Sequence, residues 1–206
     1  MSATAAVWDR PKVTPKDLLK LPKDRRCELV NGKLVGKTMA TTAVPVAGEV
    51  FGLLRQYVKE RDLGLVLMTD ASYRCFPGEP DKMRKPDVSF IRRERITLGL
   101  WEPGHIRMRP DLVVEVVSPH DEVSDVGRRI QDYLRAGVPL IWVVHPEPRH
   151  VYVYRPGGRG ETLGEQDELT GEPVLPGLRL AVREIFVPLE RYAQVSAQQA
   201  LSEPKE

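Results

Sequence analysis

Residues 109–119 read RPDLVVEVVSP, and within them the apolar run over 112–117 is interrupted by one acidic residue, Glu115. Successive side chains of a strand alternate between its two faces, so the run LVVEVV is apolar on both faces except at Glu115. Burial on both faces is typical of a central strand. A carboxylate buried there without a partner costs several kcal/mol. The stretch therefore predicts a central strand over 111–117 and a charged partner for Glu115.

A second acidic residue opens another predicted strand. Asp87 directly follows Pro86, at the start of a strand predicted over 87–91. If the two strands are neighbours, Asp87 and Glu115 can bind one hard cation such as Mg²⁺ through oxygen ligands. The alternative partner for Glu115 is an arginine in a salt bridge, and the candidates are Arg107, Arg109 and Arg129.

The surrounding sequence predicts further helices and strands. Asn31-Gly32 between two short apolar runs is typical of a β-hairpin, because both positions tolerate positive φ. Apolar residues at helical spacing predict two amphipathic helices. The expected elements are a short helix over 15–20, hairpin strands over 27–30 and 33–35, helices over 43–61 and 124–136, and strands over 65–76, 140–144, 151–154 and within 162–180. Ser124 is the expected N-cap of the second amphipathic helix, and Gly137 its stop signal.

The bulk composition predicts one folded domain. With 206 residues and 41% hydrophobic content, the chain can bury one substantial core. We expect a flexible N-terminus over 1–13, the domain over 14–189 and a mobile tail over 190–206. The two cysteines lack the spacing of a zinc site or a disulfide framework. No apolar stretch reaches the length of a membrane span, so we expect a cytoplasmic protein without membrane contact.

One segment of the chain is strongly basic. The net charge of +2 says little about nucleic acid. Residues 82–109, however, hold eight basic residues and three acidic ones. This segment, the 82–109 basic cluster, brackets Asp87 and is a candidate phosphate-binding surface; the alternative is an ordinary solvated loop face.

Four blocks of sequence, in order, resemble a known family. They are ELVNGKLV at 28–35, KPDV at 85–88, the strand at 109–119, and RIQDY leading to GVPLIW between 129 and 142. Over roughly residues 14–188 the chain resembles the Uma2 family of the restriction-endonuclease-like group, with its PD-(D/E)XK core. The resemblance implies an α/β (α+β) fold with a restriction-endonuclease-like core, in which a mixed central β-sheet is flanked by helices.

The resemblance also implies a metal site. Asp87 and Glu115 would be the ligands of Mg²⁺ or Mn²⁺, with Glu28 in support. Asp111, in a second Pro-Asp pair, ranks below Asp87 because it begins the strand that already supplies Glu115, four residues and about 13 Å away. The alternative for Glu28 is an exposed charge on the hairpin.

The basic residue of the motif stands in an unusual place. Val117 occupies the slot two residues after Glu115 where the general pattern has lysine. The resemblance implies that the family places this lysine on the following helix, four residues before the tyrosine; here that position is Arg129, before Tyr133. Arg129 lies next to the predicted inner stripe, whereas Arg128 shares a face with Asp132 and Arg135 and is expected to point to water. Arginine suits phosphate but cannot readily act as a general base.

These expectations combine into a metal-dependent endonuclease that hydrolyses DNA, with Glu28, Asp87, Glu115 and Arg129 as catalytic residues. One alternative is a catalytically degenerate nuclease fold that binds nucleic acid or a partner, which arginine at 129 favours. Another is a structural subunit without a nucleic-acid role, favoured if the 82–109 basic cluster is scattered over different faces. A homodimer is expected by analogy with enzymes that cut two strands.

Overall fold

The computed structural model describes residues 13–202 apart from 21–26, 37–40, 98–99, 101–103, 120 and 158–159. The elements are, in chain order, α1 Pro15–Leu18, β1 Cys27–Val30, β2 Lys33–Gly36, α2 Ala43–Arg61, β3 Gly64–Met68, β4 Val88–Arg92, η1 Arg93–Arg95, β5 Leu112–Val116, α3 Val123–Arg135, β6 Leu140–His145, β7 His150–Tyr154, β8 Gly160–Gly164, β9 Glu168–Thr170, β10 Arg179–Ala181 and α4 Val182–Ser202. The expected N-terminal segment 1–13 lies almost wholly outside the described residues.

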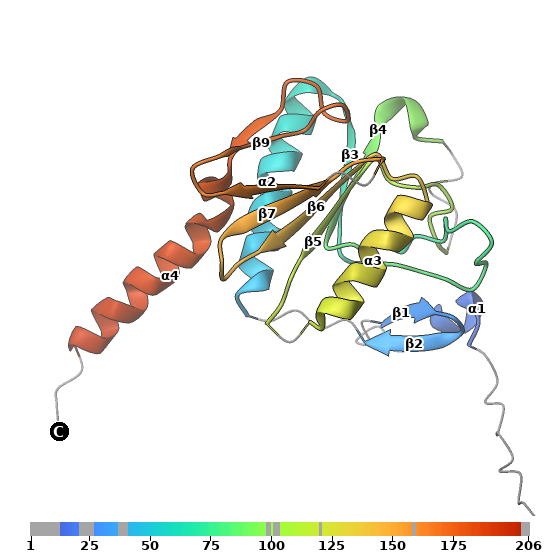
Figure 1. The fold of residues 1–206 in the computed structure, drawn as a ribbon, viewed down its shortest axis with the longest axis horizontal. Helices are drawn as coiled ribbons and strands as arrows, with labels where there is room; N and C mark the ends of the chain where they lie inside the picture. The colour runs from blue at the N-terminus through green and yellow to red at the C-terminus, as the bar shows by residue number, and fades with distance from the viewer. Residues whose placement is uncertain are drawn as a thin grey trace, which may run out of the picture.

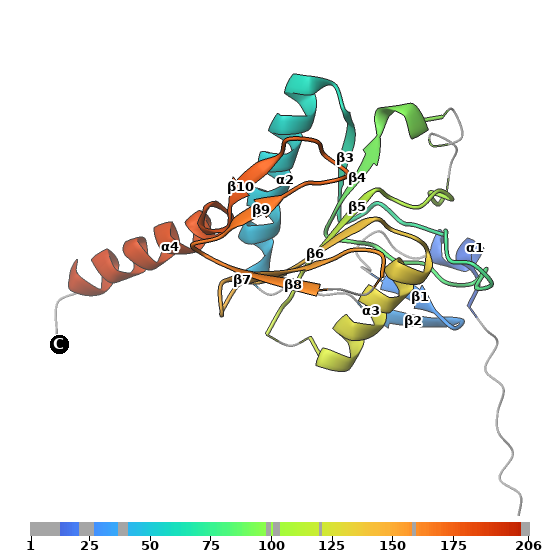
Figure 2. The ribbon, with the colours of Figure 1, turned by 45° about the horizontal axis from the view of Figure 1, so that its top comes forward.

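A six-stranded mixed sheet in the order β3-β4-β5-β6-β7-β8 forms the centre of the domain. Only β5 and β6 are parallel, and α3 makes the crossover between them. Figure 1 shows α3 on one face of the sheet and α2 on the other, and Figure 2 shows the same layers from a second direction. This confirms the mixed sheet flanked by helices that the family resemblance implied.

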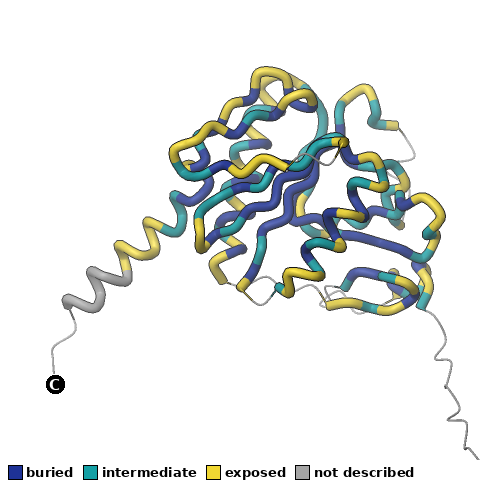
Figure 3. Tube along the Cα trace, in the orientation of Figure 1, coloured by how far each residue is buried: buried dark blue, intermediate teal, exposed yellow. Residues whose placement is uncertain are grey.

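Alternation along β5 explains how the sheet holds two cores. Leu112, Val114 and Val116 pack with α2 and the start of α4, whereas Val113 packs with α3. The residues of β5 are all buried, as expected of a central strand, and Figure 3 shows the inner strands as the most buried part of the trace. Glu115 shares the α3 face with Val113, because side chains two positions apart point to the same side.

Local signals set the ends of several elements. Asn31 and Gly32 both have positive φ at the turn between β1 and β2, as the hairpin signal predicted. Gly137 ends α3 with φ 76°: its N–H donates to the Leu134 carbonyl and the next N–H donates to the Tyr133 carbonyl. This is the Schellman arrangement, in which glycine avoids the Cβ penalty of the left-handed conformation.

Three sequence predictions differ from the structure. Ser124 is not the N-cap of α3, because the helix begins one residue earlier and Glu122 takes that position. The strand predicted over 65–76 ends at Met68, and beyond it only Tyr73 forms isolated bridges to other segments. The tail predicted over 190–206 is helical as far as Ser202, the last described residue, because α4 includes that part. None of the described helices is long and apolar enough to cross a membrane.

Candidate functional site

Antiparallel pairing of β4 with β5 brings Asp87 and Glu115 together. Val88 faces Val114 in this register, so Asp87 and Glu115 are the next residues outward on the two strands. Both carboxylates are buried, and Asp87 Oδ2 accepts a hydrogen bond from the Val116 backbone N–H at 2.8 Å. Residues at such positions have Cβ atoms about 4.5–5.5 Å apart. The register therefore places Asp87 and Glu115 opposite each other at one end of β4 and β5, and a shared ion between them stays a prediction.

Helix α3 supplies two partners to Glu115. The Tyr133 hydroxyl donates a 2.8 Å hydrogen bond to Glu115 Oε1, and Arg129 Nε lies 3.4 Å from Oε2. Of the three arginines considered as salt-bridge partners, Arg129 is thus the one that pairs with Glu115. Arg109 lies beside Asp111 instead, and Arg107 is exposed. The salt-bridge alternative for Glu115 is present in the structure.

Arg129 also reaches a second carboxylate. Its Nη2 donates a 3.1 Å hydrogen bond to Oδ1 of Asp121, in the segment between β5 and α3. Burial disfavours the charged form of Arg129, but the negative charges of Glu115 and Asp121 outweigh that effect and raise the pKa of the guanidinium above its usual range. Arg129 is therefore a permanent buried cation, 8% exposed, placed between two carboxylates.

Glu28 is not an exposed hairpin charge. It is 2% exposed, and its carboxylate accepts hydrogen bonds from Arg84 Nη1 at 2.7 Å and from the Lys85 backbone N–H at 2.8 Å. The reason is that the segment before β4 pairs with the hairpin, through reciprocal backbone hydrogen bonds between Leu29 and Met83. Glu28 consequently lies next to the segment that carries Asp87.

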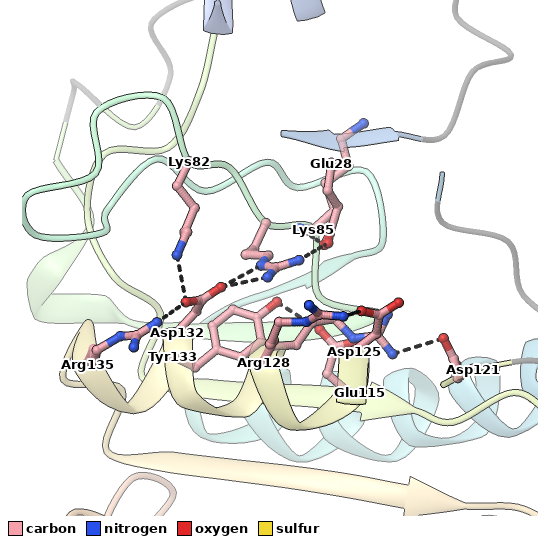
Figure 4. Close-up of polar contacts among 12 residues, drawn as sticks. Glu28, Lys82, Lys85, Glu115, Asp121, Asp125, Arg128, Asp132, Tyr133 and Arg135 are labelled. Carbon is pink, nitrogen blue, oxygen red and sulfur yellow. Dashed lines mark hydrogen bonds and ion pairs between the residues drawn. The ribbon is translucent and has the colours of Figure 1, made fainter. Parts of the chain in front are cut away.

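Asp132 corrects another expectation of the sequence, which placed it on the outer face of α3. It is 3% exposed and accepts hydrogen bonds from Lys82 Nζ at 2.7 Å and from Arg84 Nη2 at 2.6 Å. The segment containing Lys82 and Arg84 covers that face of the helix, which periodicity within α3 alone could not reveal. Arg128 does point to water, as predicted, and pairs with Asp125. Figure 4 shows these polar contacts in a row along α3, which we call the polar row.

The ionic partners of Asp132 set its protonation state. Burial alone would raise the pKa of this carboxyl, but the hydrogen bonds from Lys82 and Arg84 outweigh burial and lower the pKa below its usual range. Burial, aided by the negative charge of Glu115, raises the pKa of Tyr133 well above its usual value. Tyr133 is therefore a neutral hydrogen-bond donor toward Glu115 over the whole physiological pH range.

Replacing Asp132 with asparagine is expected to lower the free energy of unfolding by about 3 kcal/mol at neutral pH, because it removes the negative charge that two buried cations, Lys82 and Arg84, share. Each cation keeps one other carboxylate, Glu79 for Lys82 and Glu28 for Arg84. A carboxyl whose pKa is lowered on folding stabilises the protein above its unfolded pKa, about 3.9, and that stabilisation disappears as pH falls through the lower folded value. The difference between wild type and variant should thus shrink below about pH 4. Urea unfolding between pH 3 and 7 measures it.

A matched control is Asp125→Asn, which removes a solvent-facing partner of Arg128 on the same helix. Exposed ion pairs contribute at most about 1 kcal/mol, so this variant should unfold almost as wild type does. Equal destabilisation by the two substitutions would contradict a structural role for the buried Asp132 contacts.

The 82–109 basic cluster is not one surface. Lys82 and Arg84 are buried against Asp132 at one end of β4, whereas three arginines lie at or beyond the other end. These three make contacts within the chain: Arg92 with the Pro173 carbonyl, Arg93 with Asp62, and Arg95 with Asp111. These basic residues lie at opposite ends of β4, and this separation argues against one joint phosphate-binding surface. Scattering of the cluster over different faces was the observation expected to favour a structural subunit without a nucleic-acid role.

Asp111 is engaged at the start of β5, away from the Glu115 end. It is 3% exposed and accepts hydrogen bonds from the Arg92 backbone N–H and from Arg95 Nη1. The two carboxylate oxygens therefore tie the start of β5 to the end of β4 and to η1. This agrees with ranking Asp111 below Asp87 as a metal ligand.

The donor set around Asp87 and Glu115 is small. Among the described residues there is no group of three or more His, Cys, Asp or Glu side chains that could hold a metal ion. Mg²⁺ keeps several waters and is commonly bound through only one or two protein carboxylates, so two buried carboxylates on adjacent strands fit it. Arg129 beside Glu115 is the feature that opposes this fit, because it already supplies positive charge.

Several residues of the site were missed in the sequence. Lys82 and Arg84 were counted only as members of a basic cluster, and Asp121 was not considered. The sequence singled out Tyr133 only as the tyrosine four positions after Arg129, yet its hydroxyl binds Glu115. A buried tyrosine needs a partner for its hydroxyl, and this was the one signal that could have linked Tyr133 to Glu115 beforehand.

Comparisons with known proteins agree with this architecture. A crystal structure from Anabaena variabilis ATCC 29413, described as a "putative nuclease belonging to DUF820", has 24% sequence identity to this chain. The similarity covers 84% of this chain and 97% of that chain, with a TM-score of 0.71, and it establishes a shared fold. No match was found among curated proteins. The family model of Uma2, described as "Putative restriction endonuclease", matches residues 15–183, and the chain therefore belongs to the Uma2 family.

Proposed function

We propose that this protein is a metal-dependent endonuclease that hydrolyses phosphodiester bonds of DNA. The observation that carries the proposal is the buried pair of Asp87 and Glu115 on adjacent strands, where two negative charges share one end of β4 and β5. A divalent cation offsets the repulsion between two neighbouring carboxylates, and carboxylate oxygens are ligands that Mg²⁺ and Mn²⁺ prefer. The chain also belongs to a family described as "Putative restriction endonuclease", and this membership supports the same activity.

The residues of the chain have distinct parts in this proposal. Asp87 and Glu115 would hold the ion, which when bound supplies Lewis-acid stabilisation of the phosphate and activates the attacking water. Tyr133 fixes Glu115 through its hydroxyl. Arg129 provides a permanent positive charge for the scissile phosphate, and it cannot take up the proton of the water.

Glu28 has a supporting part in the same proposal. Because it is buried and bound to Arg84, it holds the guanidinium beside the segment that leads into Asp87. Arg84 is in turn fixed by Asp132 on α3. Glu28 thus connects the β1–β2 hairpin to the segment before β4 and, through Arg84, to α3.

Incubation of the purified protein with plasmid and with single-stranded DNA tests the activity. We expect nicking or linearisation with Mg²⁺ or Mn²⁺ and none when chelator is present. Cleavage that persists in chelator would contradict metal dependence, and absence of cleavage with either ion would contradict the nuclease. The same assay with RNA tests the preference for DNA.

One observation favours a second function, a nucleic-acid- or partner-binding module that keeps the nuclease fold without turnover. Arg129 already lies against Glu115, so the chain's own cation occupies the neighbourhood of the proposed ion. A domain that has lost hydrolysis can retain this arrangement, because the ion pair satisfies the buried carboxylate. Binding of DNA without cleavage under all metal conditions would support this function.

Any binding to DNA is expected to weaken steeply as salt rises, because phosphate contacts release condensed counterions. Fluorescence anisotropy with labelled DNA between about 50 and 200 mM salt measures the slope. Replacing Arg92 and Arg95 together with alanine should leave the slope unchanged, since both side chains are engaged within the chain. A flatter slope in that variant would instead restore the basic cluster as the contact surface.

Two further expectations remain predictions. A homodimer would place two sites on two strands, and the molar mass in solution tests it directly. A cytoplasmic location follows only from the sequence, and fractionation of cells that produce the protein tests it.

A further inference from the structure

Arg129 contacts its two carboxylates unequally. Its Nη2 donates a hydrogen bond to Asp121, whereas its Nε lies 3.4 Å from Glu115 and makes no hydrogen bond there. Glu115 in turn accepts a hydrogen bond on Oε1 from the Tyr133 hydroxyl. The contact between Arg129 and Glu115 is therefore one of charge alone, and separating the two groups breaks no hydrogen bond between them.

Asp121 is fixed independently of Arg129. Its Oδ2 accepts a 2.9 Å hydrogen bond from the Ser118 backbone N–H, and its own N–H donates to the Ser118 carbonyl at 2.9 Å. These contacts orient Oδ1 toward α3, where Arg129 meets it. In Figure 4 Asp121 lies beyond Glu115 at the end of the polar row, on the side away from Tyr133. Its hydrogen bond with Arg129 is therefore separate from the contact between Tyr133 and Glu115.

We propose that Asp121 is a positioning residue that holds Arg129 aside and so lets Glu115 bind a divalent cation. This inference rests on the proposed metal site at Asp87 and Glu115. Arg129 stays charged at any accessible pH and is 8% exposed, so it needs a carboxylate partner at all times. With Asp121 present, Arg129 keeps a partner when a cation takes its place at Glu115.

Without the Asp121 carboxylate, Glu115 is the nearest remaining anion for Arg129. The guanidinium then competes with the cation for the same oxygen atoms, and cation affinity falls. Removing Arg129 removes the competitor, so Asp121 loses its importance. The inference thus predicts that the effects of the two residues on cation affinity depend on each other, rather than adding.

Isothermal titration of the DNA-free protein with Mn²⁺ tests this dependence in wild type, Asp121→Asn, Arg129→Gln and the double variant. We expect Asp121→Asn to weaken binding at least about fivefold in the wild-type background, the lower end of typical coupling between sites. In the Arg129→Gln background the same substitution should change affinity less than about twofold, within the error of additivity. Arg129→Gln alone should bind Mn²⁺ more tightly than wild type.

Equal weakening by Asp121→Asn in both backgrounds would overturn the inference, because Asp121 would then act only through its own charge. If wild type binds no Mn²⁺ but Arg129→Gln does, the proposed metal function fails in this chain while the competition remains. If neither binds Mn²⁺, the metal site itself is wrong. Asp125→Asn, which removes an exposed partner of Arg128, is the matched control and should bind Mn²⁺ as wild type does.

A measurement on the wild-type protein covers the case in which a variant fails to fold. The Nε–H resonance of Arg129 in a nitrogen-15 spectrum reports its surroundings directly. We expect this resonance to shift when Mg²⁺ is added while the protein remains folded, because the guanidinium leaves Glu115. A resonance unchanged at saturating Mg²⁺ would overturn the inference.

Discussion

Asp87→Asn is expected to abolish metal-dependent cleavage, with a fall in rate of about 10³-fold or more. Asparagine preserves the size of the side chain and its capacity to accept the hydrogen bond from the Val116 N–H. It removes one of the two charges that would hold the ion. Lewis-acid catalysis supplies several kcal/mol of transition-state stabilisation, and each 1.36 kcal/mol lost is a factor of ten in rate.

The other Pro-Asp pair of the chain provides the control for this substitution. Asp111→Asn also alters a buried carboxylate at the start of a strand, but one engaged by Arg95. We expect it to lower stability while leaving Mn²⁺ affinity and the cleavage rate of the folded fraction unchanged. Isothermal titration calorimetry compares the Mn²⁺ affinity of the two variants, and plasmid cleavage compares their rates. Both measurements are made at a temperature where circular dichroism shows both variants folded. Cleavage by Asp87→Asn at the wild-type rate would remove Asp87 from the site.

The parts of the fold that the sequence predicted are those with local causes. The bounds of α2 follow from apolar spacing within the helix, and the β1–β2 hairpin follows from the turn chemistry of Asn31 and Gly32. Central burial of β5 follows from its own composition. Each of these features depends on residues close together in the sequence, so each could be predicted without knowledge of the tertiary structure.

The predictions that failed depended on contacts distant in sequence. The first turns of α4 pack on the core that contains α2, and this packing stabilises the start of the helix. The later part of α4 is more polar, and its sequence therefore resembled a tail. Asp132 appeared to face water because its partners Lys82 and Arg84 lie about fifty residues earlier in the chain. Helix propensity is a weak prior that packing overrides, and a periodic pattern does not reveal what covers the opposite face.

In the candidate site, too, features with local causes could be predicted and features that depend on distant contacts could not. Asp87 and Glu115 could be selected because each is an acidic residue in or beside an apolar strand, and a shared register then brings them together. The sequence left open whether Glu115 meets a cation or an arginine. The structure places Arg129 beside it, and the contact to Asp121 could not be anticipated, because the conformation of the segment between β5 and α3 has no periodic signal.

Substitution of Arg129 is expected to separate its role in charge stabilisation from its competition with the ion. Arg129→Ala should lower the cleavage rate about 10²-fold or more at saturating metal, by comparison with the loss of one well-placed electrostatic donor. The same variant should need less Mg²⁺ for half-maximal rate, because Glu115 is no longer paired. A rate equal to that of wild type would show that Arg129 has no catalytic part.

Arg129→Lys restores the residue that the family pattern places on this helix, and we expect it to retain or raise the cleavage rate. Lysine is a compact point charge whose pKa shifts readily on burial, so it can accept a proton where arginine cannot. Cleavage rates over pH 6–9 should therefore show a titrating group in Arg129→Lys that wild type lacks. If an inert wild type becomes a nuclease through this one change, the chain is a degenerate member that binds without turnover, and the second function replaces the first.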